Sequence, residues 1–349
     1  MRCVVGRAAL ERVRQFSVES ASGLLPSDDH LSRARGLASR FPELRQVALI
    51  RAPFAGSKNT WLALECMQIT GSFKVRGALL AMEALAARGV TDVIAASAGN
   101  HGIGVAYAAK TIGAKVTVVV PRGAPKTKTD KIAGYGATVV YAQSTGYDDA
   151  EAEAMELART AGRPFLSPYD DLDVLSGNGA SLAFEIERAL GKRPARVLAP
   201  IGGGGLTTGL ACAYRGAGEP SQVWGVQSEA SCAFAQSLER DVAVTTLPPA
   251  VTLAEGLEGG ISERGFARAR ATLAGAIVVT EEEIARAMKV AYRDLGLALE
   301  GSAAVALAPI LAESGSEPGS EPGGETVGET VVVLTGRNVD PERLAQVVC

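Results

Sequence analysis

The chain has 349 residues, of which 47% are hydrophobic and 21% are charged, and its formal net charge is −3. This length suits one large domain or two medium ones. The small net charge provides no basic surface for nucleic acid, and no apolar run reaches the roughly 18 residues that span a bilayer. We therefore expect partners that include neither nucleic acid nor a membrane.

Cysteine and histidine usage narrows the possible chemistry further. The five cysteines show neither a disulfide framework nor the spacing of metal ligands, so we expect reduced thiols and a cytoplasmic location. With only two histidines, His30 and His101, a histidine-rich zinc site is nearly excluded. The cysteines are Cys3, Cys66, Cys212, Cys232 and Cys349.

The first half of the chain reads as a short arm followed by alternating elements. Weak patterning in residues 1–45 predicts a loose arm or an irregular leading helix. The first clear helix is predicted from Ser72, whose hydroxyl can cap it, to Arg88 and Gly89. We then predict strands at 93–96, 116–120 and 138–141, and helices at 100–112, at 125–132 with Pro125 in its first position, and at 148–160.

The second half repeats this alternation. Thr280, followed three residues later by Glu283, predicts a capping box at the start of a helix. Residues 313–329 contain two Ser-Glu-Pro-Gly repeats and predict a flexible insertion. The alternation as a whole predicts an α/β fold with mainly parallel sheets and helices on both faces. Further strands are expected at 197–199, 223–227, 277–279 and 331–334, and a further helix from Leu206.

Lys74 stands in the first turn of the predicted helix that begins near Ser72. The positive end of the helix dipole there disfavours an extra proton on an ammonium group. Its neighbours Phe73 and Val75 are apolar, so partial desolvation would lower the pKa in the same direction. A free amine is what imine formation requires. The alternative for any single lysine is an ordinary solvated position on a helix.

Four consecutive glycines, Gly202 to Gly205, separate a predicted strand from a predicted helix. Backbone N–H groups in such a loop can converge on an anion, and the helix N-terminus adds a favourable field. No Gly-Lys-Ser/Thr follows, and the spacing is not that of a dinucleotide site with an acidic ribose ligand. A small phosphate monoester therefore fits this loop better than a nucleotide, and a merely flexible turn is the alternative.

Two further segments follow predicted strands. Ser97–Gly102 lies at the carboxyl end of a parallel strand, where α/β proteins bind ligands. Its N–H groups can hold a carboxylate and Asn100 can bond a phenolate oxygen, whereas His101 reads more simply as a structural residue of the first turn. Leu334–Asn338 follows the last strand, where a hydroxyl can meet a ring nitrogen, although this segment alone is equally compatible with an ordinary loop.

Taken in order, these segments resemble the fold-type II pyridoxal-phosphate enzymes, and among them the serine/threonine dehydratase and serine racemase group. The resemblance covers roughly residues 45–345 and implies a two-domain α/β fold of the tryptophan synthase β type. The large cofactor-binding domain would comprise 1–90 and 171–349, and a small mobile α/β domain would comprise 91–170. The matching segments are Thr70–Ala78, Ser97–Gly102, Gly202–Gly205, Ala254–Gly256 and Leu334–Asn338.

The resemblance implies a role for each matching residue. Lys74 would hold pyridoxal 5′-phosphate as an imine and would later move the Cα proton. The other cofactor-binding residues would be Phe73 against the ring, Asn100 at the 3′ oxygen, Gly202, Gly203, Gly204, Gly205 and Leu206 at the phosphate, Thr335 at the pyridine nitrogen, and Gly256 and Glu300 lining the site. The substrate carboxylate would be bound by Ser97, Ala98, Gly99 and His101.

The implied reaction is β-elimination from a β-hydroxy amino acid such as L-threonine or L-serine, which gives a 2-oxo acid and ammonia. The substrate amine would displace Lys74, the freed lysine would remove the α-proton, and the β-hydroxyl would leave. Racemases of this group carry a serine on the face opposite the lysine, at the position of Ala98. Because alanine cannot move a proton, elimination is expected over racemisation.

Three departures from the group bear on metal binding and substrate choice. Members with a divalent-metal site use carboxylates at positions matching Gln227 and Cys232. Neither is a hard anionic oxygen ligand, so we expect no metal at that place, although Glu229 lies nearby. Glu300-Gly301-Ser302 replaces a more usual Glu-Pro pair, and Arg337 stands where a small residue is common, so both bear on the substrate.

Several alternatives stay open at this point. The same cofactor would support β-replacement or a threonine-synthase-like transfer, and the substrate of a dehydratase would also fit a specialised hydroxy amino acid such as hydroxyaspartate. A non-catalytic binder of cofactor or amino acid is a third class, which Lys74 and the four glycines disfavour. Because the group is often dimeric or tetrameric, we expect a homo-oligomer acting on a small amino acid.

Overall fold

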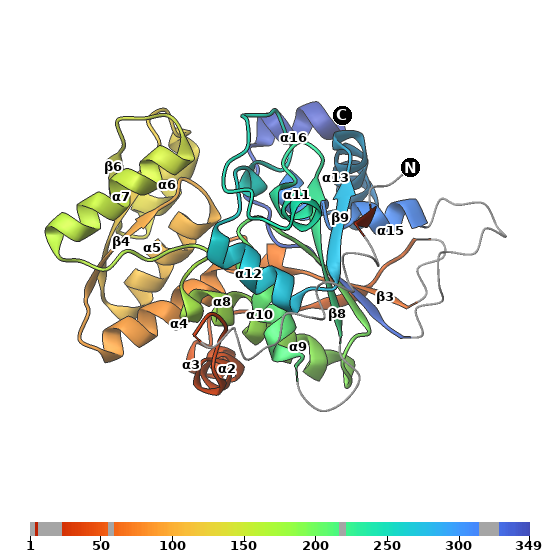
Figure 1. Cartoon of the computed structure of the whole chain (residues 1–349), viewed down its shortest axis with the longest axis horizontal. Coiled ribbons are helices and arrows are strands. Elements are labelled where there is room, and N and C mark those ends of the chain that lie inside the picture. Colours follow the sequence, from red (N-terminus) through yellow and green to blue (C-terminus); the bar gives the residue numbers. More distant parts are fainter. Residues whose placement is uncertain (1–3, 6–22, 55–58, 216–220, 314–327) are drawn as a thin grey trace.

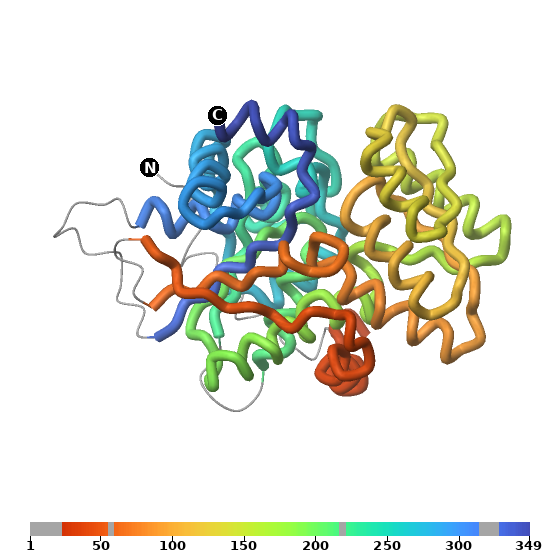
Figure 2. Tube along the Cα trace, turned by 180° about the vertical axis from the view of Figure 1, so that it is seen from behind, coloured from red at the N-terminus to blue at the C-terminus, as the bar shows by residue number. Residues whose placement is uncertain are grey.

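The computed structural model describes residues 4–5, 23–54, 59–215, 221–313 and 328–349, which form two sheets surrounded by helices. The sheets lie side by side along the longest axis of the molecule (Figure 1), and the view from behind shows the same arrangement (Figure 2). The larger sheet has the strand order β1-β9-β8-β7-β10-β3-β2, and the smaller has the order β4-β5-β6. The predicted α/β fold is thereby confirmed.

The strands run mainly parallel. Within the larger sheet β9, β8, β7, β10 and β3 are parallel, and only the edge strands β1 and β2 are antiparallel to their neighbours. All pairs in the smaller sheet are parallel. The strands are β1 (Val4–Val5), β2 (Leu49–Arg51), β3 (Thr60–Ala63), β4 (Asp92–Ala96), β5 (Lys115–Val120), β6 (Thr138–Tyr141), β7 (Arg196–Pro200), β8 (Gln222–Ser228), β9 (Gly275–Val279) and β10 (Thr330–Val333).

Helices cover both faces of both sheets. The helices are α2 (Asp28–Arg35), α3 (Leu37–Arg40), α4 (Lys74–Ala87), α5 (Asn100–Ile112), α6 (Lys126–Gly134), α7 (Tyr147–Ala161), α8 (Leu172–Leu175), α9 (Ser181–Leu190), α10 (Gly205–Ala213), α11 (Ala233–Arg240), α12 (Glu263–Thr272), α13 (Glu281–Leu295), α14 (Gly301–Ala304), α15 (Ala308–Glu313) and α16 (Pro341–Val348). Shorter turns are η2 (Glu65–Met67), the π-helical η3 (Ser176–Ala180) and η4 (Glu255–Leu257).

Alternation along the central strands explains why two helical layers are needed. In β10, Val331 and Val333 pack into the core that contains α9 and α10, while Val332 packs into the core that contains α13 to α15. In β4, Val93 and Ala95 face the first of these cores, while Ile94 and Ala96 pack with the alanines of α7. Successive side chains of a strand point to opposite faces, so apolar strands of this kind are covered on both sides.

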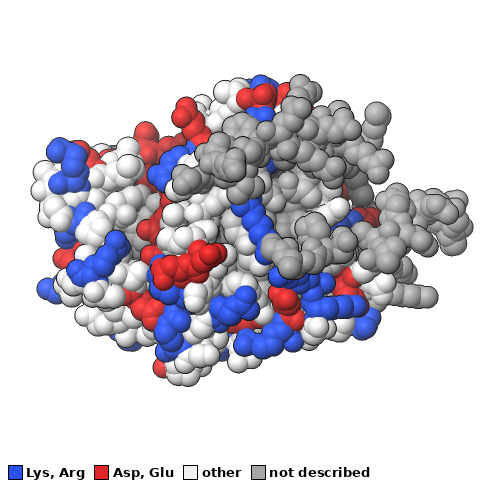
Figure 3. Space-filling model, turned by 60° about the horizontal axis from the view of Figure 1, so that its bottom comes forward, with Lys and Arg blue, Asp and Glu red and all other residues white. Residues whose placement is uncertain are grey.

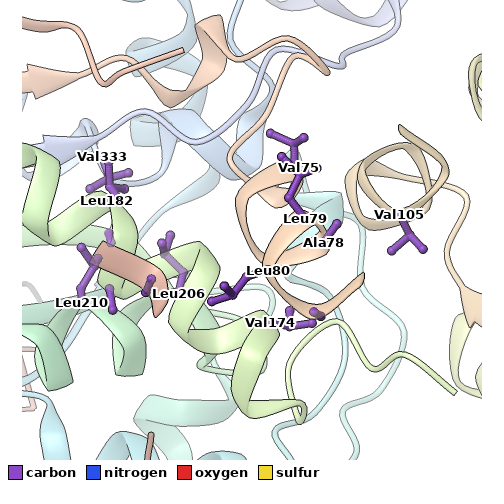
Figure 4. Packing of buried hydrophobic residues seen from close by; sticks show 14 of the residues in the cluster. Val75, Ala78, Leu79, Leu80, Val105, Val174, Leu182, Leu206, Leu210 and Val333 are labelled. Atoms are coloured by element: carbon purple, nitrogen blue, oxygen red, sulfur yellow. The ribbon is translucent and has the colours of Figure 1, made fainter. Parts of the chain in front are cut away.

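Helix α4 lies between α5, next to the three-stranded sheet, and α10, next to the seven-stranded sheet. In Figure 4, Ala78 lies on the side of α4 that faces Val105 of α5, and Leu80 lies on the side that faces Leu206 of α10. Close approach to η3 is possible because glycine stands on both sides. A Cβ at Gly177 would lie 2.6 Å from the Cα of Gly77, so neither position tolerates a larger residue without a backbone shift.

Most of the predicted elements are confirmed, with two errors at helix starts. The Thr280–Glu283 capping box is present. Ser72 does not cap α4, because the helix begins at Lys74 with Phe73 as its N-cap, and the Ser72 hydroxyl is buried without a partner among the described residues. Pro125 is the N-cap of α6 and not its first residue. The short strands β2 and β3 were not predicted, and in the leading segment α2 and α3 are regular helices.

The remaining organisational predictions have separate outcomes. The division into a large domain of 1–90 and 171–349 and a small domain of 91–170 stays a prediction. The flexible insertion was predicted for 313–329, and its residues 314–327 lie outside the part of the chain that the structure describes. No helix in the described ranges is long and apolar enough to cross a membrane. On the face shown in Figure 3, basic and acidic side chains are interspersed.

Candidate active site

Lys74 is the first residue of α4, and its side chain is half-buried. Its Nζ donates a hydrogen bond to the carbonyl oxygen of Pro168 at 3.3 Å and lies 5.3 Å from the ring centroid of Phe73. Burial lowers the pKa of Lys74 to about 8, and the nearby Glu300 only partly opposes this shift. At pH 7 about one tenth of such an amine is unprotonated, compared with under about a thousandth for an ordinary lysine.

A buried ion network holds the first turn of α4. The Arg76 guanidinium bonds both oxygens of Glu65 at 2.7 and 2.9 Å and both oxygens of Glu185 at 2.8 and 2.9 Å. The side chains of Arg76 and Glu65 are 0% exposed. Burial alone would lower the pKa of Arg76, but the two carboxylates raise it above its ordinary value. Since buried charges are tolerated only when paired, this network fixes the backbone two residues beyond Lys74.

The segment Gly202–Gly205 connects β7 to α10 as a loop of bare backbone. Gly204 has a φ of 84°, a left-handed conformation that side chains disfavour. A Cβ at Gly203 would stand 2.7 Å from the Cγ of Tyr169, so no side chain fits there. Leu206 follows within α10 and is buried. The loop therefore presents N–H groups at a helix N-terminus, where an anion is favoured.

The turn Ser97–His101 connects β4 to α5. Ser97 Oγ accepts a hydrogen bond from the Gly99 N–H at 3.0 Å, so the turn itself satisfies that amide. Ala98 is half-buried. His101 is buried with its Nε2 3.0 Å from the carbonyl oxygen of Leu166. Burial lowers the pKa of His101 to about 3, and the neighbouring lysine adds to this shift, so the imidazole is neutral at pH 7.

Three polar side chains from distant parts of the chain meet beside this turn. Asn100 Nδ2 donates to Glu300 Oε1 at 2.7 Å, and Asn338 Nδ2 donates to Asn100 Oδ1 at 2.7 Å. The Asn338 N–H donates to Glu300 Oε2 at 3.2 Å. Burial raises the pKa of Glu300, while its bonds from the two asparagines act in the opposite direction. Both ends of the Asn100 amide are thus engaged with protein groups in this structure.

The remaining predicted residues lie in the same region. Thr335 is buried directly after β10, and its carbonyl oxygen accepts a hydrogen bond from the Phe73 N–H at 3.0 Å. This bond places the end of β10 beside the start of α4. The Gly256 N–H donates to Ser302 Oγ at 2.8 Å, and the Gly256 carbonyl oxygen lies 3.9 Å from where a Cβ at Gly202 would stand. These contacts join Phe73 to Thr335, and Gly256 to Ser302 and to the start of the glycine loop.

The proposed loss of the metal site has a partial structural account. Gln227 Nε2 donates to the carbonyl oxygen of Ile201 at 3.0 Å, and its Oε1 accepts from the Ala235 N–H at 3.1 Å. The amide thus links the residue before the glycine loop to α11. Within the described ranges, no three His, Cys, Asp or Glu side chains group together as metal ligands. The absence of a metal in the protein stays a prediction.

Sequence reasoning missed three residues that organise this region. Tyr169 contacts the glycine loop, Asn338 bridges Asn100 and Glu300, and Arg76 anchors α4. Arg76 and Asn338 stand in segments that were already singled out, and the charge of Arg76 at the start of an apolar helix was a usable signal. Tyr169 carried no local signal, because its contacts involve residues 18 and 34 positions away along the chain.

These residues fit pyridoxal phosphate on grounds of chemistry and space. A primary amine with a pKa of about 8 suits an aldehyde, and the glycine loop offers an anion site that a Cβ at Gly203 would disrupt. Two buried hydroxyls of the region, on Ser72 and Thr208, have no hydrogen-bond partner among the described residues. When the cofactor binds, Lys74 would hold its aldehyde carbon and Gly202–Gly205 its phosphate.

Comparisons with known proteins agree with this chemistry. The family model described as "Pyridoxal-phosphate dependent enzyme" matches residues 41–336. The chain is 34% identical over 318 residues to the L-threonine dehydratase catabolic TdcB of Staphylococcus aureus (strain USA300), covering 89% of each chain. It also resembles the processed threonine deaminase isoform 2 of Solanum lycopersicum, with a TM-score of 0.78, 28% identity and coverage of 93% and 88%. Maize serine racemase gives a TM-score of 0.80, 25% identity and coverage of 92% and 96%. The chain belongs to the pyridoxal-phosphate dependent enzyme family.

Proposed function

We propose that this protein is a pyridoxal-phosphate-dependent ammonia-lyase that dehydrates a β-hydroxy amino acid, such as L-threonine or L-serine, to a 2-oxo acid and ammonia. The similarity to proteins named threonine dehydratase and threonine deaminase supports this reaction class. The observation that carries the proposal is the place of Lys74 at the start of α4, with its Nζ 3.3 Å from the carbonyl oxygen of Pro168 and near the ring of Phe73. Lys74 has a pKa of about 8, whereas the pKa of His101 is about 3.

The residues of the chain would divide the work as follows. When bound, the cofactor supplies an electron-withdrawing ring that spreads the negative charge left at Cα. The Nζ of Lys74 would take the α-proton, because an amine with a pKa of about 8 is both available and basic near neutral pH. The Ser97–His101 turn would orient the substrate carboxylate, and Gly202–Gly205 would hold the cofactor phosphate.

The product follows from the number of proton-moving groups. A racemase needs a second group to return a proton to the opposite face of Cα. Ala98, at the position where serine stands in racemases of the group, has no ionisable atom, and neutral His101 has no acidic proton to give at pH 7. A one-base site would favour loss of the β-hydroxyl over inversion.

The test is a substrate panel with the purified protein. The protein is stripped with hydroxylamine, refilled with pyridoxal phosphate, and incubated with L-threonine, L-serine, D-serine and threo-3-hydroxyaspartate. Release of 2-oxo acid from at least one substrate, absent in Lys74→Ala, is the expected result. If no β-hydroxy amino acid yields a 2-oxo acid, the dehydratase proposal fails. Added thiols then show whether the protein is a replacement enzyme, because such an enzyme would convert them into β-substituted amino acids.

A further inference from the structure

Tyr169 occupies the point where Lys74, the glycine loop and the three-stranded sheet meet. The residue before it, Pro168, accepts the hydrogen bond from Lys74 Nζ at 3.3 Å. Its own hydroxyl donates to Glu151 Oε2 at 2.5 Å. The next residue, Asp170, pairs with the buried Arg268 of α12 at 2.6 Å. This short segment therefore contacts the candidate lysine and, through Tyr169, the glycine loop.

The ring of Tyr169 forms a wall against the glycine loop. The three atoms nearest to a Cβ built at Gly203 all belong to Tyr169, at 2.7, 2.8 and 3.1 Å. A Cβ at Gly205 would lie 3.4 Å from the Tyr169 Cα. Because the loop has no side chains of its own to fix its shape, its conformation depends on what packs against it. The Tyr169 ring supplies that packing for Gly203.

The hydroxyl of Tyr169 reaches α7, a helix that packs against the three-stranded sheet. Glu151 is in α7, whose buried alanines Ala150 and Ala154 pack in one core with Ile94 of β4. Burial raises the pKa of Glu151, and the bond from Tyr169 acts in the opposite direction. Burial likewise raises the pKa of Tyr169, and Glu151 adds to that shift. The bond thus joins two partly desolvated groups, and such bonds are stronger than those in water.

We propose that Tyr169 is a positioning residue that sets the shape of the glycine loop through its ring and couples the loop's hold on the cofactor phosphate to α7 through its hydroxyl. The proposal rests on the cofactor of the family and not on the dehydration reaction. Its test can therefore fail or succeed independently of the substrate. Glu151, which also has a side-chain hydrogen bond with Tyr147, acts on the loop through Tyr169 and need not touch the cofactor.

The experiment measures how tightly the protein holds pyridoxal phosphate. Tyr169→Phe keeps the ring on Gly203 and removes only the bond to Glu151. We expect the cofactor dissociation constant to rise about tenfold, since bonds to charged partners have that order of effect. Tyr141→Phe is the matched control. It also removes a single hydroxyl, whose bond of 3.4 Å joins the exposed Tyr141 of β6 to Thr129 of α6 and does not involve the glycine loop. Its dissociation constant should equal that of the wild type.

A double-mutant cycle identifies the bond as the cause. Glu151→Ala should raise the dissociation constant about as much as Tyr169→Phe, and the double variant should be no weaker than either alone. Two outcomes overturn the proposal. The first is a Tyr169→Phe variant with a lowered melting temperature and an unchanged dissociation constant, which is the behaviour of a merely structural bond. The second is full additivity of the two substitutions, which would mean that the residues act separately.

Discussion

The two halves that meet at the candidate site are held in different ways. The half built on the seven-stranded sheet fixes Lys74 through fully buried charges on Arg76, Glu65 and Glu185. The half built on the three-stranded sheet also forms a partly exposed pair with the larger half, between Lys128, whose side chain is 28% exposed, and Glu255. Buried charges lose most when unpaired, whereas exposed pairs contribute little. The contrast predicts large effects on one side and small ones on the other.

Loss of the amine should have the largest effect. Lys74→Ala removes the only group assigned to move the α-proton, so release of 2-oxo acid should fall by roughly four orders of magnitude or more. Lys110→Ala is the control, because Lys110 is exposed in the last turn of α5. A coupled assay for ammonia measures the rate. A rate for Lys74→Ala within tenfold of the wild type would assign the proton transfer to another residue.

Breaking the buried network around Arg76 should mainly lower the stability of the fold. Arg76→Met leaves Glu65 and Glu185 buried without a cation, which should lower the free energy of unfolding by about 3–5 kcal/mol. Urea denaturation followed by circular dichroism measures this loss. The control is Arg159→Met, which breaks a pair with Glu156 on the surface of α7, where both side chains are more than half exposed. Equal destabilisation by both variants would remove the distinction between the two halves.

The pKa of Lys74 gives a prediction about pH. Capture of pyridoxal phosphate by the stripped protein requires the unprotonated amine, so its rate should rise about tenfold per pH unit up to pH 8 and then level off. The sign follows from burial, which lowers the pKa and frees the amine at lower pH than in an ordinary lysine. Stopped-flow absorbance between pH 6 and 10 records the rate. A rate that still rises through pH 10 would show that Lys74 is solvated.

Removal of the contact between α6 and the half built on the seven-stranded sheet should have the smallest effect. Lys128 lies 3.4 Å from Glu255, and its charge also acts on Glu258 and Glu300. Because the pair is partly exposed, Lys128→Met should raise KM by about twofold to fivefold, and 0.5 M salt should reduce the difference. Lys126→Met, on the same helix but paired with Asp130, should leave KM unchanged. A larger effect at position 126 would refute a specific contact at Lys128.

The same contrast explains which features could be predicted from sequence. Lys74 and Gly202–Gly205 were identified because each motif is local, and the structure places both at helix starts. Ser72 was expected to cap α4 by its residue type, but the chain enters the helix through Phe73 in a helical conformation, which leaves the serine side chain buried. Backbone contacts with the segment after β10, from Phe73 to Thr335 and between Ser72 and Gly336, compete with the local preference there.

Contacts between distant segments account for what sequence could not supply. The bond between Asn100 and Glu300 joins residues 200 positions apart, and that between Asn338 and Asn100 joins residues 238 apart. No periodicity or spacing encodes such a meeting. Strand β3 was also missed, because Thr60–Ala63 is too short to show alternation, and its place is set by pairing with β10.

The central claim is that one base acts at Cα, and the course of the reaction in deuterium oxide tests it most directly. The loaded enzyme is incubated with L-threonine and L-serine, and the 2-oxo acid released is compared with the Cα-inverted amino acid (D-allo-threonine or D-serine) and the 2-deuterated substrate recovered. We predict 2-oxo acid as the main product, with no accumulation of the Cα-inverted amino acid. Accumulation of D-serine faster than pyruvate would contradict the claim, because inversion needs a second proton-moving group on the face opposite Lys74.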